Sequence, residues 1–424
     1  MSIHKAYNFS FMANQDYFRG KTLLTLLILF LFAAQSCSDK DESEDVQQDD
    51  TNALAALNLP EDPFNYSNPD YPTHFTVNQF PGGGGGQTAV IQNDNTPQDN
   101  PVTDDGATLG RVLFYDVKLS ANSTIACASC HKQDLGFGDS EILSTGFEGG
   151  KTGRHSMGLS NARFYASGKF FWDERAATLE DQVLMPFQDE VEMGLTLEEL
   201  VNIVSEQEYY PVLFERAFGG RSINSDRISK ALAQFVRSMI SYQAKYDDAR
   251  STENDPIRPF AGFSPAENRG KTLFMTNAKG VVPCAACHQS EAFVGMAAPP
   301  PGMGNTTTAT NNGLDAETSA DEGVFLTTAN GRDRGKFKTP SLRNIAVRAP
   351  FMHDGRFSNL QEVIDHYSTG IQDHAQLDPR LRTPGGQPAR YDFTEQEKAD
   401  LIAFLETLTD QSFLTDEKFS NPFK

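Results

Sequence analysis

The pattern Cys-x-x-Cys-His occurs twice in this chain, as "CASCH" from residue 127 to 131 and as "CAACH" from residue 284 to 288. Two thiols three positions apart can add to the two vinyl groups of one haem, and the adjacent histidine then lies under the iron as an axial ligand. This spacing is typical of c-type haem attachment. We therefore expect two covalently bound haem c groups, one on Cys127, Cys130 and His131 and the other on Cys284, Cys287 and His288.

Other chemistries for these four cysteines fit the spacing less well. A Cys₄ zinc site usually separates its Cys-x-x-Cys pairs by about 15 to 20 residues and needs no histidine after each pair. A redox dithiol explains neither the duplication nor the histidines. The fifth cysteine, Cys37, lies far from the others, so no disulfide framework is expected.

Helices must position these motifs, because helix signals dominate the rest of the sequence. Capping boxes predict helix starts at "TLEE" (196–199), "SPAE" (264–267) and "TEQE" (394–397). The segment "ISKALAQFVRSMI" (228–240) places its apolar residues on one helical stripe, which predicts a buried helix. Strand-like alternation is sparse, so the expected fold class is mostly α.

A weak internal repeat accompanies the two motifs. "GRVLFYD" (110–116) precedes the first motif, and "GKTLFMT" (270–276) precedes the second at a similar spacing. Such a repeat indicates a duplicated small haem domain. We expect an N-terminal domain over 103–255 and a C-terminal domain over 256–424.

The N-terminus is typical of an exported protein. Arg19 and Lys21 precede an apolar run over 22–34, which suits a signal peptide and is short for the alternative, a transmembrane anchor. The following "AAQSC" resembles a bacterial lipoprotein signal, although Ala34 replaces the usual leucine. We predict a signal peptide over 1–36, a lipid on Cys37, and a flexible acidic and Pro/Gly-rich linker over 37–102. The expected location is the periplasm or cell surface of a Gram-negative bacterium, with membrane contact only through the lipid.

The net charge of −21 limits the partners that the surface can bind. Such a surface repels nucleic acid and anionic membranes, and it would steer a basic protein partner toward the molecule.

Two longer segments, 154–194 ("RHSMGLSNARFY…EVEMG") and 335–367 ("GKFKTPSLRNIA…IDHY"), add to the haem motifs. Together they resemble the bacterial dihaem cytochrome c peroxidase family, including its MauG-like members, over roughly 103–408. The resemblance implies two cytochrome-c-like domains that meet at an interface. It also implies a peroxidatic haem in the N-terminal domain and an electron-transfer haem in the C-terminal domain.

The same resemblance assigns roles to single residues. His131 and His288 would be the proximal ligands of the peroxidatic and the electron-transfer iron. Trp172 would lie between the haems and relay charge, while Gln182 and Glu192 would face the open side of the peroxidatic haem. A carboxylate there can carry a proton from the near to the far peroxide oxygen, and an amide can orient the peroxide. Outside the motif, Glu192 would be taken for a surface residue of an acidic stretch.

Departures from the family pattern sharpen these expectations. Gly149 stands where reductively activated relatives have a capping histidine, so the resemblance implies a five-coordinate peroxidatic iron, with His155 as an alternative cap. Relatives commonly have a calcium-binding asparagine at the position of His155, so a standard calcium site is not expected, and calcium stays open only through the backbone at Pro350. On the second haem, Tyr367 matches the tyrosine ligand of MauG-like members, with Met352 as the alternative ligand.

The remaining histidines and one long loop have weaker expectations. His353 would lie behind the haem ligands, whereas His366 and His374 would be exposed. The polar segment 306–328 has no assigned role.

The resemblance implies a dihaem peroxidase that reduces hydrogen peroxide with electrons from a small cytochrome c or a cupredoxin. One alternative is MauG-like oxidation of a protein or organic substrate through a high-valent dihaem state. Another is a non-catalytic electron-transfer cytochrome, which would have no need of Gln182 and Glu192. Family members are often dimers, so a homodimer is an open expectation.

Overall fold

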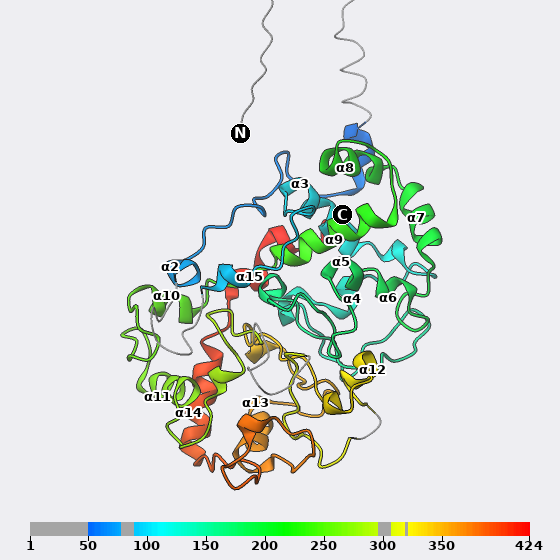
Figure 1. Ribbon diagram of the computed structural model, residues 1–424. Coiled ribbons are helices and arrows are strands. Elements are labelled where there is room, and N and C mark those ends of the chain that lie inside the picture. Colours follow the sequence, from blue (N-terminus) through cyan, green and yellow to red (C-terminus); the bar gives the residue numbers. More distant parts are fainter. Residues whose placement is uncertain (1–49, 78–88, 296–306, 319–320) are drawn as a thin grey trace, which may run out of the picture. The chain divides into compact units, whose positions relative to one another are not determined.

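The structure, a computed structural model, describes residues 50–77, 89–295, 307–318 and 321–424, all within the single compact unit Gln48–Lys424. Within these ranges the regular elements are helices, joined by loops with isolated β-bridges, so the expected mostly α class is confirmed (Figure 1). The α-helices are α2 (Thr73–Thr76), α3 (Asp104–Tyr115), α4 (Cys127–Cys130), α5 (Leu179–Gln182), α6 (Met185–Gln188), α7 (Leu197–Ser205), α8 (Tyr209–Phe218), α9 (Ser225–Ser238), α10 (Lys245–Ser251), α11 (Pro265–Met275), α12 (Phe325–Thr328), α13 (Leu360–Asp365), α14 (Glu395–Glu406) and α15 (Gln411–Thr415). A π-helix (His366–Gly370) continues α13.

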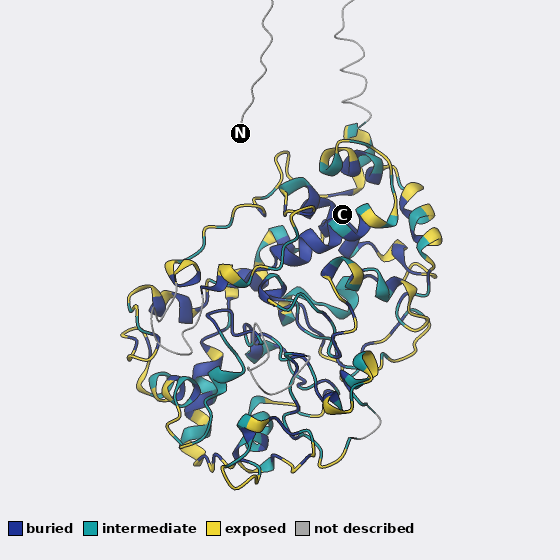
Figure 2. Ribbon diagram, viewed as in Figure 1, coloured by how far each residue is buried: buried dark blue, intermediate teal, exposed yellow. Residues whose placement is uncertain are grey.

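The three expected helix starts are confirmed. Thr196, Ser264 and Thr394 are the N-cap residues of α7, α11 and α14, and each forms a reciprocal capping box with the glutamate three positions later. These caps satisfy backbone N–H groups that a helix start leaves without intrahelical partners. The apolar stripe of 228–240 is also buried as expected, along α9 and the turn that follows it (Figure 2).

Each half of the molecule is built on one close pair of helices. In the first half α3 packs against α9, and in the second half α11 packs against α14 (Figure 1). Gly110 of α3 faces the carbonyl of Ala231 so closely that a Cβ would overlap it, and Gly270 of α11 faces the carbonyl of Asp400 in the same way. The two glycines open the repeated segments "GRVLFYD" and "GKTLFMT", so the repeat marks equivalent helix crossings.

The duplication extends to the surroundings of the two motif histidines. The rings of Phe114 and His131 lie 6.5 Å apart, and those of Phe274 and His288 lie 6.4 Å apart, with interplanar angles of 42° and 41°. Behind each histidine a short loop closes through an antiparallel bridge, from Lys132 to Gly138 and from Gln289 to Val294. The halves therefore place their histidines in matching environments.

A second repeated element, which the sequence comparison did not reveal, carries the residues opposite the motifs. Antiparallel bridges join Phe170 to Ala176 in the first half and Phe351 to Phe357 in the second. Two residues after each bridge, Thr178 caps α5 and Asn359 caps α13. Trp172 and His353 occupy the same position within these loops, and their rings lie 6.5 Å apart.

Packing crosses the expected domain boundary at residues 255 and 256. Phe413, Leu414 and Phe419, from the end of the chain, lie in the hydrophobic core of the first half. Conversely, Tyr246 and Ala249 of α10 lie in the core of the second half. The C-terminal segment thus returns to the N-terminal domain, where its aromatic rings contact Phe235 of α9 and Phe137.

The expected flexible linker over 37–102 is wrong for the part that the structure describes. Tyr66, Phe75 and Val90 are 3%, 0% and 0% exposed and belong to the first core. His74 of α2 contacts Asp247 of α10 at 2.8 Å. The prolines of the described part indicated irregular backbone correctly, but a few aromatic side chains are enough to anchor such a chain to a core.

The predicted signal peptide and the lipidated Cys37 lie outside the described residues. Within the described ranges, every helix is too short or too polar to cross a bilayer.

Candidate functional site

The first Cys-x-x-Cys-His motif opens onto a cavity of about 540 Å³. A neighbouring cavity of about 70 Å³ continues it toward Cys127. The larger cavity brings together six residues that lie up to 62 positions apart in the sequence: Cys130, His131, His155, Trp172, Gln182 and Glu192. Every residue expected around the first haem therefore lines one continuous region.

The hydrogen bonding of His131 leaves one ring nitrogen ready to bind a metal. Nδ1 lies 2.9 Å from the carbonyl oxygen of Phe137, so Nδ1 carries the proton and donates it there. Burial lowers the pKa of His131, which keeps the ring neutral. Nε2 then carries the lone pair with which histidine binds iron; the Ser156 hydroxyl lies 3.5 Å from it and donates to the Cys130 carbonyl at 2.9 Å.

The four motif cysteines are free thiols in this structure. Burial raises the pKa of Cys127 and of Cys284 to about 12, and that of Cys287 to about 11. Such thiols are protonated at neutral pH and are poor metal ligands or redox dithiols by themselves. They remain available for thioether bonds to a haem.

Glu192 is a half-buried carboxyl group that lines the first cavity. It follows α6 in a tight loop, where its backbone N–H donates to Asp189 Oδ1 at 3.1 Å. Burial raises the pKa of Glu192, the negative charge of Asp189 adds to the rise, and Arg175 opposes it. Gln182 ends α5. Together with Glu192 it lines the cavity of about 540 Å³ and the neighbouring cavity of about 70 Å³. The pair therefore combines a carboxyl group whose raised pKa suits it to exchanging a proton with an amide that can orient a ligand.

Trp172 lies in the wall between the two motif cavities and lines both of them. Its indole N–H donates to the carbonyl of His155 at 2.8 Å, and its own carbonyl accepts from the backbone N–H of Lys338 at 2.8 Å. Trp172 is thus held by one residue from each half: His155 accepts from its indole, and Lys338 donates to its backbone carbonyl. This is the position that the resemblance implied for a charge relay.

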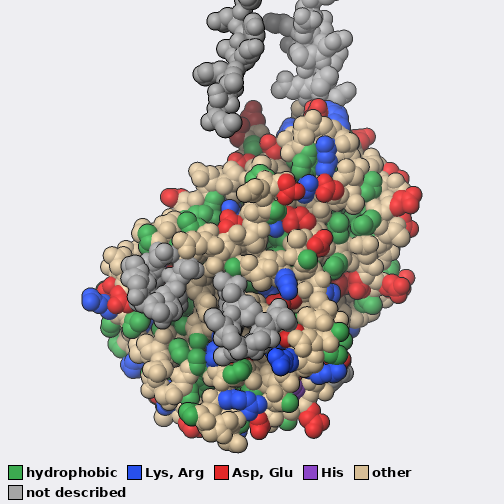
Figure 3. Space-filling model, viewed as in Figure 1, with side chains coloured by type: hydrophobic (Ala, Val, Ile, Leu, Met, Phe, Trp, Pro, Cys, Tyr) green, Lys and Arg blue, Asp and Glu red, His purple; other side chains and the backbone are tan. Residues whose placement is uncertain are grey.

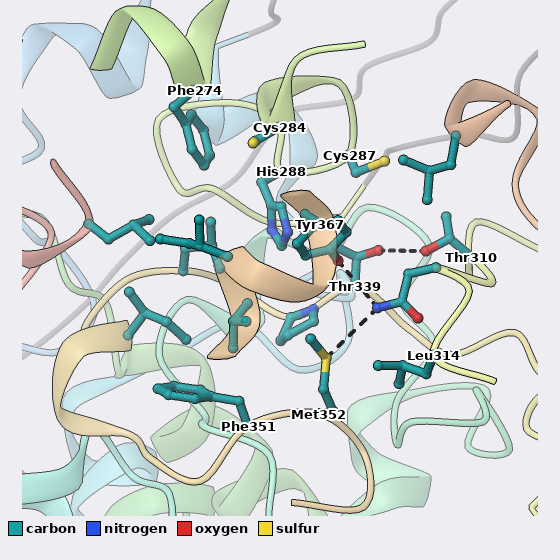
Figure 4. Close-up of a pocket in the computed structure, with 18 of the residues that line it drawn as sticks. Phe274, Cys284, Cys287, His288, Thr310, Leu314, Thr339, Phe351, Met352 and Tyr367 are labelled. Atoms are coloured by element: carbon teal, nitrogen blue, oxygen red, sulfur yellow. Dashed lines mark hydrogen bonds between the residues drawn. The ribbon is translucent and has the colours of Figure 1, made fainter. Parts of the chain in front are cut away.

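The second motif opens onto a cavity of about 200 Å³ with mostly apolar walls, which suits the faces of a porphyrin. Figure 4 shows His288 extending into the cavity from the segment that carries Cys284 and Cys287, with Met352 entering from the opposite side. Burial lowers the pKa of His288 to about 4, so the ring is neutral and able to bind a metal.

Both expected ligands of the second iron, Tyr367 and Met352, line this cavity. Tyr367 belongs to the π-helix that follows α13, and burial raises its pKa to about 12. The side-chain amide of Asn312 reaches both ligands, at 3.2 Å from the Tyr367 oxygen and 3.8 Å from the Met352 sulfur (Figure 4).

The exposed positions predicted for His366 and His374 are wrong. The two residues are 7% and 5% exposed. His366 Nε2 lies 3.1 Å from the carbonyl oxygen of Asn312, and His374 Nε2 lies 2.8 Å from the Thr318 hydroxyl. Both histidines hydrogen-bond to residues of the polar segment 307–318. Their buried ring nitrogens therefore have partners, and these partners lie far away in the sequence.

His155 and His353 lie side by side at the seam of the halves. The backbone N–H of His155 donates to the carbonyl of His353 at 2.8 Å. His155 Nδ1 lies 3.1 Å from the carbonyl oxygen of Glu141, and the imidazole of His353 stacks on Phe337 at 3.6 Å. His155 lines the first cavity and His353 the second.

A buried cation in the cavity walls tests whether these cavities fit haem. Lys338 lines both motif cavities, and its ammonium lies over the Tyr165 ring at 3.5 Å. Burial lowers the pKa of Lys338 to about 7. Among the described residues Lys338 has no carboxylate within ion-pair distance. Because a buried charge needs a counter-charge, a carboxylate of bound haem fits beside Lys338.

Two residues of the cavity walls, Asn312 and Lys338, had no role expected from the sequence. Asn312 lies in the polar segment 306–328, to which no role was assigned. That segment is tied to the first half, where Asp321 pairs with Arg154 at 2.6 Å. The length of this polar stretch inside an otherwise matching family pattern was the signal for Asn312, whereas Lys338 lies within the segment 335–367 that carries the resemblance.

Residues 104–255 match the family described as di-haem cytochrome c peroxidase. The methylamine utilization protein MauG of Methylophilus methylotrophus is 32% identical over 312 residues, which cover 74% of this chain and 84% of that protein. Cytochrome c551 peroxidase of Nitrosomonas europaea is 27% identical over 309 residues, which cover 73% of this chain and 81% of that protein.

Solved structures show the same likeness. A MauG-like protein associated with microbial copper homeostasis is 32% identical, with a TM-score of 0.65, and the match covers 78% of this chain and 96% of that one. The diheme peroxidase BthA from Burkholderia thailandensis shares the fold at 22% identity, with a TM-score of 0.57 over 77% of this chain and 91% of that one.

Proposed function

Because this chain belongs to the di-haem cytochrome c peroxidase family, we propose that it reduces hydrogen peroxide to water with electrons from a small cytochrome c or a cupredoxin. Family membership makes the protein an oxidoreductase with two haem c cofactors, and its peroxidase relatives imply a peroxide substrate and a redox donor. One observation supports the proposal most strongly. Glu192 and Gln182 line only the first of the two motif cavities, while Trp172 lines both.

In this proposal Cys127, Cys130 and His131 would hold one haem, and Cys284, Cys287 and His288 would hold the other, through thioether bonds and imidazole nitrogens. Lys338, which lines both motif cavities, would pair with a haem carboxylate. Bound haem supplies the iron that exchanges electrons with peroxide. Calcium has no part in the proposal.

The residues of the chain would manage the protons and the path of the electrons. Glu192 takes a proton from the near oxygen of bound peroxide and delivers it to the far oxygen, which leaves as water. Gln182 donates an N–H that orients the peroxide. Trp172 passes electrons from the second cavity to the first, and two electrons from the donor with two protons from solvent complete the reduction to two waters.

The donor and the cellular location are proposed from charge and from the N-terminus. Acidic side chains are spread over the face shown in Figure 3, and the chain carries a net charge of −21. Such a surface favours a basic donor. The apolar run over 22–34 and Cys37 support export and lipid attachment in the periplasm or at the cell surface.

MauG-like oxidation of a protein or organic substrate is the second candidate. Tyr367 favours it, because a tyrosine ligand stabilises ferric and higher oxidation states. Gly149 favours it as well. This residue is exposed, with open space around it, where a cap would have to enter. A pure electron carrier is disfavoured, since it would not need a half-buried carboxyl group in the cavity that His131 lines.

The first test is the electron paramagnetic resonance spectrum of the purified ferric holoprotein, before and after one equivalent of hydrogen peroxide. A high-spin signal beside a low-spin signal, both lost on adding peroxide, would support an open first haem that reacts. Two low-spin signals that ignore peroxide would contradict the proposal and make His155 the first suspect as a cap.

A second measurement separates the two catalytic candidates. With a reduced basic cytochrome c as donor, a peroxidase oxidises two donors for each peroxide consumed. If peroxide abolishes both signals but donor oxidation does not follow, the MauG-like candidate replaces the peroxidase.

A further inference from the structure

The carboxamide of Asn312 is placed between the two candidate ligands of the second haem. Its nitrogen lies 3.2 Å from the phenolic oxygen of Tyr367 and 3.8 Å from the sulfur of Met352. Figure 4 shows both contacts as dashed lines that meet at one nitrogen. Because a thioether is a weak acceptor, the shorter contact to oxygen is the hydrogen bond that matters.

The backbone around Asn312 is fixed on both sides, so the side chain has a defined position. Before it, Thr310 exchanges two backbone hydrogen bonds of 2.9 Å with Phe337. After it, the carbonyl of Gly313 accepts from the backbone N–H of Gln372 at 2.8 Å. The carbonyl of Asn312 itself accepts from His366 Nε2 at 3.1 Å.

This last contact joins Asn312 to the element that carries Tyr367. His366 and Tyr367 are consecutive residues of the π-helix His366–Gly370. Asn312 therefore meets that helix at two points, through its backbone oxygen and through its side-chain nitrogen. A loop residue held twice by one helical turn is suited to fix the orientation of the phenol.

We propose that Asn312 is a positioning residue for the second haem: its amide N–H donates to the Tyr367 oxygen, selects that oxygen over the Met352 sulfur as the iron ligand, and weakens the electron donation of the phenol. The inference rests on the proposed function, which assigns a haem to this cavity. A hydrogen bond to a ligand atom withdraws electron density from the iron, and such bonds are a means by which proteins raise a haem potential.

The test compares holoproteins that carry Asn312→Leu, Asn312→Ala or Thr310→Val with the unchanged protein. Leucine matches asparagine in shape and cannot donate, whereas alanine adds no bulk and serves if leucine disturbs haem loading. Thr310→Val is the matched control, because Thr310 lines the same cavity and its hydroxyl hydrogen-bonds, among the described residues, only to Thr339, at 3.4 Å. The readouts are the reduction potential of each haem by spectroelectrochemical titration and the low-spin ferric signal.

Both Asn312 variants are expected to lower the potential of the second haem and leave that of the first unchanged, while Thr310→Val matches the unchanged protein. In a Tyr367→Phe background, Asn312→Leu is expected to have no further effect, since its partner atom is gone. A potential that stays the same or rises in both Asn312 variants overturns the proposal. So does a Tyr367→Phe protein whose second haem is unaltered.

Failure of the proposed function gives a different pattern. If the unchanged protein ignores peroxide while Asn312→Leu still lowers the potential, the role of Asn312 stands and the peroxidase does not. If the unchanged protein turns over peroxide and Asn312→Leu leaves the potential of the second haem unchanged, the peroxidase function stands and the role of Asn312 does not.

Discussion

Replacing Glu192 with glutamine tests whether this carboxyl group moves the proton during peroxide cleavage. Glutamine keeps the size and the hydrogen-bonding capacity of the side chain but cannot take up and release a proton. The change lies beside His131 in the first cavity and leaves the second cavity intact. Haem content and the ferric spectrum should therefore be unchanged.

The size of the effect follows from the chemistry that is removed. A positioned acid or base contributes about 10²- to 10⁴-fold to a rate. At about 1.4 kcal/mol for each tenfold step, this corresponds to about 3 to 5 kcal/mol of transition-state stabilisation. We expect kcat/KM for hydrogen peroxide to fall by about that factor in Glu192→Gln.

The pH dependence has a definite sign. Glu192 must be ionised to accept the first proton, and burial together with the charge of Asp189 raises its pKa above the ordinary 4.5. The rate is therefore full above this raised pKa and falls as the pH drops through it. Asp189→Asn removes the neighbouring negative charge, so the acid limb should move to lower pH.

The assay is steady-state peroxide consumption with excess reduced donor, measured across pH for the three proteins at equal haem loading. Glu192→Gln should lose the acid limb together with the rate. A Glu192→Gln protein that retains its rate to within about threefold, far less than the factor expected of an acid or base, would refute the proton-carrier role.

Two further predictions concern the frame that holds the cavities. Gly110→Ala forces a Cβ onto the carbonyl of Ala231. It should destabilise the holoprotein by about 1 to 3 kcal/mol, which calorimetry would detect as a lower Tm. The control is Gly220→Ala, which should leave Tm unchanged because there is open space at Gly220. Asp247→Asn breaks a buried pair with Arg343 and should cost about 3 to 5 kcal/mol. Since the folded pKa of Asp247 is lowered to about 2, its contribution is complete above pH 4 and is lost between about pH 4 and pH 2. An acid-unfolding midpoint that does not move in Asp247→Asn would contradict this reasoning.

The features that could be predicted from the sequence are those that depend on residues close together in the chain. The capping boxes at Thr196, Ser264 and Thr394 begin the helices they predicted, because a cap depends on residues three positions apart. The apolar stripe of α9 likewise depends only on helical periodicity. The two haem motifs predicted the places where the cavities form.

Long-range contacts account for what was missed. Phe75 is buried although its neighbours are prolines and polar residues, because its partners Phe164 and Tyr242 lie elsewhere in the chain. The polar surroundings of His374 indicated exposure, yet Thr318 and Asn311 satisfy the ring inside the molecule. Patterns along the chain contain no information about such partners.

The duplicated loops let one half of the molecule serve as a reference for the other. Tyr367 lies eight positions after its N-cap residue Asn359, and the position eight after Thr178 is Pro186, which lines the first cavity. Proline has no side-chain atom that can bind iron. If the two domains diverged at this one position, Tyr367 would occupy a ligand position on the second iron. The first iron would have no ligand there and could bind a substrate.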